Sequence, residues 1–343
     1  MLDDLKNLCA LSGVSGNEDE VRDYILSRVN GCSDDVTVDS MGNVIVYKKG
    51  DRVPAKKIML CAHMDEVGVI VTRITDDGYL KFAMIGGVDS RVIAGKAVVF
   101  GRDRVFGVIG CKAAHLVKGK ERDKTVDVED LFIDIGAKNR EEAEKFVSIG
   151  DAGAFEGEAR EFGDGFLKAK AIDDRFGCAV LLALIESRLP VDCIFAFTVQ
   201  EEVGLRGACP AAYRASPDIA LIVEATTAAD LPSVSDNKKV CRVGSGAVVP
   251  FMDKGTIYDR ELYGTIINIA EKNEIPWQTK NVVAAATDGA SVQRSRMGVK
   301  TAAIAAPVRN LHSPSCVVKI SDMEAVSRLT RLSLYELGAR SWG

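Results

Sequence analysis

Five short segments of the chain run from apolar residues into carboxylate or imidazole side chains. The residues at their ends are His63 and Asp65, Asp173 and Asp174, Glu201 and Glu202, Glu224, and His312. Short runs rich in Val, Ile and Phe are typical of buried strands, and in open α/β sheets functional groups gather at the carboxyl ends of strands. Acids and histidines that several strands bring to one cleft are the ligands a divalent metal centre needs. The pattern therefore predicts a two-metal hydrolase site.

Each motif also has an ordinary structural explanation when it is considered alone. A lone His63-x-Asp65 is more often a polar pair of the surface or core. The pair Asp173-Asp174 suits a helix N-terminus, and Glu201-Glu202 suits a solvated strand end. Five such motifs at apolar segment ends, in a chain with only three histidines, are much harder to explain in this way. The joint pattern favours one shared metal site.

The residue types indicate what each motif can do. The neutral imidazole of His63 is a good zinc ligand, and Asp65, on the same face of a strand, can hold the other ring nitrogen. One carboxylate of the Asp173-Asp174 pair can bridge two ions through its two oxygens, and the other can orient a ligand. One of the adjacent glutamates can bind metal while the other takes a proton from the metal's water, whose pKa coordination lowers from about 15.7 toward 7. Cys61 would point to the same side as His63, so a thiolate ligand is a minor alternative.

The elements that must position these residues differ along the chain. From about residue 69 to 163, short β-like pieces alternate with Gly and Asp, which predicts a small β-barrel or sandwich inserted into a larger domain. After about residue 165, strands alternate with helices, which favours an α/β layered domain. We therefore expect an α/β fold with a discontinuous catalytic domain, residues 1–68 and 164–343, and an inserted β-barrel, residues 69–163.

Individual elements follow from local periodicity. Helices are expected at 2–12, 18–30, 139–147, 176–187, 257–273 and 323–337. Strands are expected at 36–39, 43–47, 57–62, 193–199 and 219–223, and in the inserted region at 68–75, 79–82, 96–100, 105–109 and 131–135. The catalytic domain should then hold a central mixed β-sheet flanked by helices.

Composition limits the classes of partner. A net charge of -5 and the lack of a Lys/Arg block give no reason to expect nucleic-acid binding. No apolar run approaches the roughly 20 residues of a membrane span, and the first residues lack a signal-peptide layout. We therefore expect no membrane association and a cytoplasmic location. The nine cysteines are scattered without a CxxC pair, so we expect reduced core thiols.

A second pattern extends over nearly the whole chain. It consists of Gly13-Val-Ser-Gly16, Asp39-Ser-Met-Gly-Asn43, Ala62-His-Met-Asp-Glu-Val-Gly68, Gly86-Gly-Val-Asp-Ser-Arg91, Ala171-Ile-Asp-Asp-Arg175, Val199-Gln-Glu-Glu-Val-Gly204, Thr287-Asp288 and Leu311-His-Ser-Pro314. In order and spacing these stretches resemble the tetrahedral (TET-type) dinuclear metallo-aminopeptidases, which include glutamyl, lysyl and deblocking enzymes. The chain departs from that family where Glu224 replaces a frequent Asp. It also departs at Lys112-Ala-Ala-His115, where we expect His115 to have a structural or interface role.

The resemblance implies a role for each site residue. One metal ion would be held by His63, Asp173 and Glu224, and the other by Asp173, Glu202 and His312, with Asp173 bridging the two. Glu201 would be the general base that activates a metal-bridged water, and Asp65 would orient His63. The peptide bond between Asp173 and Asp174 would be cis.

The resemblance also implies the reaction, the cofactors and the assembly. The enzyme would remove N-terminal residues from peptides with a free N-terminus, using two divalent metal ions per subunit. Carboxylate and imidazole ligands suit zinc or cobalt first, with manganese as a further choice. The barrel would mediate dimerisation, and dimers would assemble into a tetrahedral dodecamer. The alternatives are an amide deacylase or carboxypeptidase on the same dinuclear site, or a non-catalytic assembly protein.

Overall fold

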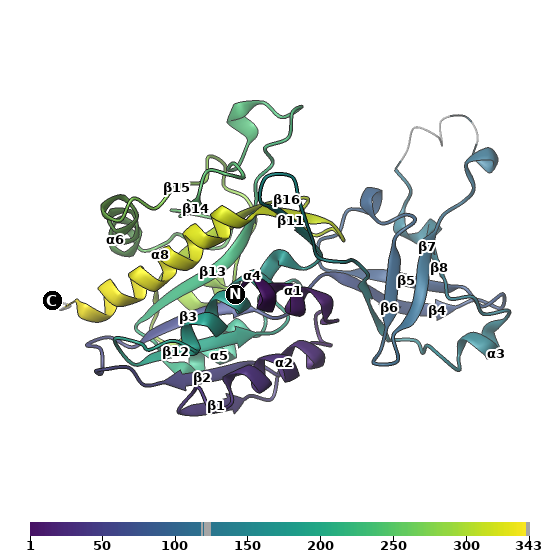
Figure 1. Ribbon diagram of the computed structural model, residues 1–343. Helices are drawn as coiled ribbons and strands as arrows, with labels where there is room; N and C mark the ends of the chain where they lie inside the picture. The colour runs from purple at the N-terminus through teal and green to yellow at the C-terminus, as the bar shows by residue number, and fades with distance from the viewer. Residues whose placement is uncertain (118, 120–124, 341–343) are drawn as a thin grey trace.

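A mixed β-sheet forms the centre of the larger part of the molecule (Figure 1). The computed structural model describes residues 1–117, 119 and 125–340. The strands of the sheet are β1 (Asp35–Val38), β2 (Val44–Lys48), β3 (Ile58–His63), β10 (Arg160–Phe162), β11 (Phe166–Ala169), β12 (Cys193–Thr198), β13 (Ile219–Thr227), β14 (Ala247–Val248), β15 (Trp277–Gln278), β16 (Lys300–Arg309) and β17 (Cys316–Lys319). Their order is β1-β2-β12-β3-β13-β16-β17-β11-β10, with β14 paired to β15 and β16.

The four central strands β12, β3, β13 and β16 are parallel to one another. Their carboxyl ends therefore lie at the same edge of the sheet, where α/β proteins bind ligands. All six residues of β3 are buried, as expected for a parallel strand that is covered on both faces.

Helices cover both faces of this sheet. The helices are α1 (Leu2–Ala10), α2 (Asp19–Val29), α4 (Ile172–Ile185), α5 (Ala208–Ala215), α6 (Arg260–Lys272), α7 (Gly289–Gln293) and α8 (Ile320–Ala339). Alternate residues of β3 belong to different layers, since Ile58 and Leu60 pack in one core with α1, α2, α4, α6 and α8, whereas Met59 and Cys61 pack with α5 and α7. No helix among the described residues is long and apolar enough to cross a membrane.

A closed barrel lies beside the sheet (Figure 1). Its strands are β4 (Gly68–Ile74), β5 (Leu80–Ile85), β6 (Ala97–Phe100), β7 (Val105–Gly110), β8 (Phe132–Asp134) and β9 (Ala152–Phe155), in the order β4-β5-β8-β7-β6-β9. The barrel encloses its own apolar core, which includes Val69, Leu80, Phe100 and Ile133. Since β4 begins five residues after His63, the barrel is inserted into the chain directly after the strand that carries His63.

The α/β fold class expected from the sequence is confirmed, two local expectations were wrong, and some elements, β9 and α5 among them, were not expected. The expected helix at 139–147 is the short α3 (Arg140–Ala143). The strand β9, which closes the barrel, was not expected, because its sequence Ala-Gly-Ala-Phe has a small residue at most positions. Finally, Glu224 does not end its strand: β13 continues to Thr227, and Glu224 is buried within it.

Candidate metal centre

The edge formed by the carboxyl ends of the parallel strands collects the residues that the sequence singled out. His63 is the last residue of β3, Glu224 lies in β13, and Glu201 and Glu202 form the turn after β12. Asp173 belongs to the non-helical first turn of α4, where its peptide bond to Asp174 is cis, as expected. His312 lies in the loop between β16 and β17.

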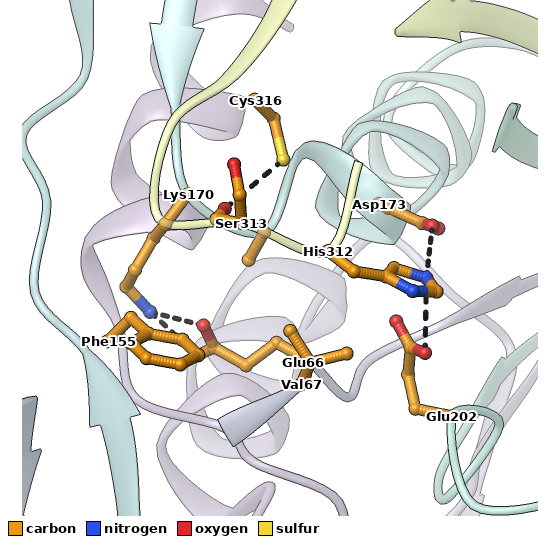
Figure 2. A pocket seen from close by; sticks show the side chains of 10 residues that line it. Glu66, Val67, Phe155, Lys170, Asp173, Glu202, His312, Ser313 and Cys316 are labelled. Atoms are coloured by element: carbon orange, nitrogen blue, oxygen red, sulfur yellow. Dashed lines mark hydrogen bonds and ion pairs between the residues drawn. The ribbon is translucent and has the colours of Figure 1, made fainter. Parts of the chain in front are cut away.

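The Asp173 carboxylate lies between the two histidines. Its Oδ1 is 3.1 Å from His63 Nε2, and its Oδ2 is 3.5 Å from His312 Nε2. On the first side, Glu224 Oε1 lies 3.6 Å from His63 Nε2. On the second side, Glu202 Oε2 lies 3.3 Å from His312 Nε2, and Figure 2 shows the His312 ring between Asp173 and Glu202. The geometry is therefore two ligand clusters that share one carboxylate.

Glu201 belongs to the same site. Donor atoms of His63, Glu201 and Glu224 lie within 4.8 Å of one another, as do those of His63, Asp173 and Glu202. A third group of this kind adds Asp174 to Asp173 and Glu224. From the sequence, Asp174 was expected only to orient a ligand. Its position next to Asp173 was the only sequence signal that it belongs to the site.

The electrostatics of the cluster fit a divalent cation. Burial, helped by the charge of Asp173, raises the pKa of Glu202 to about 7 and that of Glu224 to about 8. Burial lowers the pKa of His312, but its hydrogen bond to Asp173 and the charge of Glu202 raise it to about 9. Without a cation, these buried acids must share protons to avoid uncompensated charge. Divalent ions would replace those protons, and imidazole and carboxylate are suitable ligands for them.

Asp65 connects the two halves of the site. Its carboxylate faces His63 Nδ1 at 3.4 Å and accepts backbone hydrogen bonds from Glu201 at 2.9 Å and Glu202 at 3.1 Å. Ser15 Oγ donates a further hydrogen bond of 2.6 Å to it. Burial alone would raise the pKa of Asp65. The hydrogen bond and charge of His63, together with the hydrogen bond from Ser15, outweigh burial, so the pKa of Asp65 is lowered. The Asp65 carbonyl oxygen also lies 3.2 Å from His63 Nδ1, so the backbone and the carboxylate of Asp65 together leave Nε2 free to serve as the ligand.

His312 is held by the barrel side of the molecule. Its Nδ1 is 3.1 Å from the carbonyl oxygen of Gly87, which again leaves Nε2 facing the carboxylates. A Cβ on Gly87 would lie only 3.4 Å from that ring nitrogen. The Gly86-Gly87 stretch was a sequence match, but the contact of Gly87 with His312 could not be read from it.

Side chains from other segments of the chain hold the turn that carries Glu201 and Glu202. Gln200 has the left-handed φ of 56°, an unfavourable conformation for a residue other than glycine. The buried Glu18 carboxylate accepts its backbone N–H at 3.1 Å, and Asn43 Oδ1 accepts that of Val199 at 3.0 Å. These contacts stabilise the strained turn, which is typical of functional sites.

Behind the site, a buried ion-pair cluster was not foreseen. Lys170 Nζ lies 2.6 Å from Glu66 Oε1, and Arg175 lies 3.2 Å from the same oxygen. Figure 2 draws the contact between Lys170 and Glu66. Arg175 also donates to the carbonyl of Met64, so the cluster fixes the chain just after His63. Glu66 and Arg175 stand inside two motif stretches, which is the only signal the sequence offered.

Two other residues that the sequence singled out lie outside the metal cluster. Cys61 Sγ faces Thr198 and Asp288, at 4.0 and 3.8 Å, and burial raises the pKa of its thiol well above the usual value. Cys61 is in none of the potential ligand groups of the described residues. His115 is exposed on a short 3-10 turn (Ala114–Leu116) and is likewise in none of them.

A groove of about 500 Å³ opens beside His312. One wall is formed by the barrel-side loop with Gly87, Asp89, Arg91 and Lys96, and the other by residues 310–315. The groove therefore touches the site at His312, between the loop after β5 and the loop after β16.

Comparison with known proteins relates the chain as a whole to a family of aminopeptidases. The family model of the M42 glutamyl aminopeptidases matches residues 42–329. A putative aminopeptidase of Acetivibrio thermocellus is 40% identical over 96% of this chain and 97% of its own length. The lysyl aminopeptidase of Pyrococcus furiosus is 32% identical, with 97% of this chain and 96% of its own covered. The structure of the Pyrococcus horikoshii TET1 peptidase, described as assembling into a tetrahedron or a large octahedral shell, superposes with a TM-score of 0.85 at 34% identity, covering 96% and 98%.

Proposed function

Because the chain belongs to the M42 glutamyl aminopeptidase family and is a metal-dependent aminopeptidase, we propose how its residues divide the work. Two divalent ions would share Asp173, one with His63 and Glu224 and the other with Glu202 and His312. Glu201 would be the general base, and Asp65 the residue that orients His63. The observation that carries this assignment is the position of Asp173, whose two oxygens face one histidine each.

The donor set supports zinc or cobalt, with manganese as the next choice. Divalent ions held there would lower the pKa of a water molecule and polarise the carbonyl of the first peptide bond. Glu201 would accept a proton from that water as its oxygen attacks the carbonyl carbon, and would return the proton to the leaving amine as the C–N bond breaks. Burial and the charge of Asp288 raise the pKa of Glu201, against the effect of His63. A raised pKa makes its carboxylate a stronger base.

The substrate is a peptide with a free N-terminus. The groove beside His312 is large enough for the chain that follows the first residue. The names of the related proteins do not agree on that first residue, since the family description says glutamyl and one relative is a lysyl aminopeptidase.

We further propose that residues 1–68 and 164–343 form the catalytic domain and that the inserted region, residues 69–163, forms dimers through its barrel; the last strand of this region, β10, joins the mixed sheet. Two apolar side chains on the outer face of β7 support this role, because Phe106 is 55% and Val108 39% exposed. Exposed apolar patches mark interaction surfaces. The assembly of the TET1 relative supports a homo-oligomer, with a tetrahedral dodecamer of dimers as the specific proposal.

Two measurements test the proposed site. Elemental analysis of the purified protein should find two divalent ions per chain. L-leucyl-p-nitroanilide should be hydrolysed, whereas N-acetyl-leucine and a peptide with a blocked N-terminus should not. Turnover of the acetylated compound would favour a deacylase, and a metal-free, inactive protein would favour a pure assembly role.

A further inference from the structure

Asp288 is a buried acid that the proposed mechanism does not use. It precedes the first residue of α7, only 1% of its surface is exposed, and its side chain does not cap that helix. Its Oδ2 accepts a hydrogen bond from the Thr198 hydroxyl. Its Oδ1 is buried and has no hydrogen-bond partner among the described residues. Because burying a carboxylate in this way is costly, the contact with Thr198 needs an explanation.

Thr198 is the last residue of β12, and the turn with Glu201 and Glu202 follows it directly. Its hydroxyl lies within hydrogen-bond distance of Asp288 and also 3.2 Å from the carbonyl oxygen of Ala62. A hydroxyl has only one proton to donate, and a carboxylate is a stronger acceptor than a carbonyl. Burial raises the pKa of Asp288 to about 6, so its carboxylate is still ionised at neutral pH. Thr198 therefore donates to Asp288.

Helix α7 also holds the far side of the same turn. Ser291, three residues after Asp288, donates a hydrogen bond of 3.0 Å from its Oγ to the carbonyl oxygen of Leu205. Leu205 has the left-handed φ of 58°, and its N–H donates a hydrogen bond of 2.8 Å to the carbonyl oxygen of Glu201. The start of α7 is therefore bonded to the chain both before Glu201, at Thr198, and after it, at Leu205.

The start of α7 is itself anchored in the core. Val292 is fully buried in the same apolar cluster as Cys61 of β3 and Tyr258. The Tyr258 hydroxyl donates a hydrogen bond of 2.6 Å to Asp253, so Thr287 Oγ1, which lies 3.1 Å from that hydroxyl, donates to Tyr258 in turn. A helix fixed in this way can transmit its position to the turn through hydrogen bonds.

We propose that Asp288 is a positioning residue for Glu201, which it holds in the direction of the metal site by accepting the hydrogen bond of Thr198. This inference rests on the role of Glu201 as general base proposed above. A general base must lie within hydrogen-bond reach of the proton that it accepts, and a displacement of about 1 Å can slow a reaction about 100-fold. Asp288 supplies an acceptor oxygen and carries no proton in the reaction. Its unpartnered Oδ1 agrees with this role, because the contact uses only one of the two oxygens.

The first test separates the hydrogen bond from the charge of Asp288. Thr198→Val and Asp288→Ala remove the hydrogen bond, so each should lower kcat on L-leucyl-p-nitroanilide about 10- to 100-fold at saturating metal, with KM within about threefold of the wild type. Thr198→Ser keeps the hydroxyl, and Asp288→Asn keeps an acceptor oxygen and places its NH2 group where Oδ1 has no partner. Both should therefore keep kcat within about threefold of the wild type. Thr301→Val, at a fully buried threonine near the opposite end of β16, is the matched control and should keep the wild-type kcat.

A second readout does not depend on catalysis. In the metal-loaded protein, hydrogen–deuterium exchange of the amides of residues 199–205 should be about tenfold faster in Thr198→Val and Asp288→Ala, but not in the two conservative variants or in Thr301→Val. Unchanged exchange in both variants that lack the hydrogen bond overturns the positioning role. A kcat in Asp288→Asn as low as in Asp288→Ala also overturns it, because the charge would then be what matters. If Glu201→Gln keeps wild-type turnover, the assignment of the base fails, whereas faster exchange still supports the hold of Asp288 on the turn.

Discussion

Replacing Asp65 by Asn should weaken metal binding and slow catalysis without unfolding the protein. The side chains have the same shape, but an amide has one acceptor oxygen and an NH2 group. Asp65 now accepts hydrogen bonds from the backbone N–H groups of Glu201 and Glu202 and from Ser15, and it faces His63. In the variant, the NH2 group must confront one of these donors.

Two routes give the size of the effect. A buried donor left without an acceptor costs about 1–3 kcal/mol. Loss of a carboxylate that orients a metal-bound histidine typically reduces metal affinity by about 10- to 100-fold, which corresponds to about 1.4–2.8 kcal/mol. The two values agree, so we expect a 10- to 100-fold increase in the metal dissociation constant. Because Asp65 also positions the backbone of Glu201, kcat should fall even at saturating metal.

The assay is a metal titration against a competing chelator, followed by kcat measurements on L-leucyl-p-nitroanilide at saturating metal. Asp77→Asn, at an exposed position in the barrel, is the control and should behave like the wild type. Unchanged affinity together with unchanged kcat in Asp65→Asn would refute the role of this carboxylate. A loss of kcat alone would limit its role to the Glu201 turn.

Three further outcomes follow from the site. Glu201→Gln should keep the metal content of the wild type but reduce kcat at least about 100-fold, and wild-type turnover on L-leucyl-p-nitroanilide would contradict its role as base. His312→Ala should lose one ion per chain in elemental analysis at equal free metal, and two retained ions would argue against it as a ligand. Burial raises the pKa of Glu18 to about 7, above its unfolded value of about 4.3, so the stability linked to its protonation is fully present below about pH 4.3 and is lost progressively as the pH rises to about 7. In urea melts with chelator, Glu18→Gln should therefore gain stability relative to the wild type between pH 5 and pH 8.5; a constant difference would exclude this linkage.

Patterns of neighbouring residues predicted the buried strands that lead into the site. The apolar run before His63 could be read as a strand because a parallel strand covered on both faces needs apolar side chains throughout. The same reasoning placed β12 before Glu201. It failed at β13, where Ala225-Thr226-Thr227 continues the strand past Glu224 by pairing with β16. Glu224 looked like the end of its strand because the residues that compensate its buried charge lie far from it in the sequence.

The contacts that make the site rigid could not be predicted from local sequence patterns. Three side chains from separate segments fix the turn at Val199–Glu202: Glu18, Asn43 and Asp65. Each contact joins residues 136 to 182 positions apart, so no helical or strand periodicity records it. Their residue types nevertheless share one property, since all three offer a side-chain oxygen to a backbone N–H. A strained turn without regular backbone pairing needs such acceptors, and their burial explains why the two glutamates can be held in fixed directions. Loss of any one acceptor should therefore disturb Glu201 and Glu202 together.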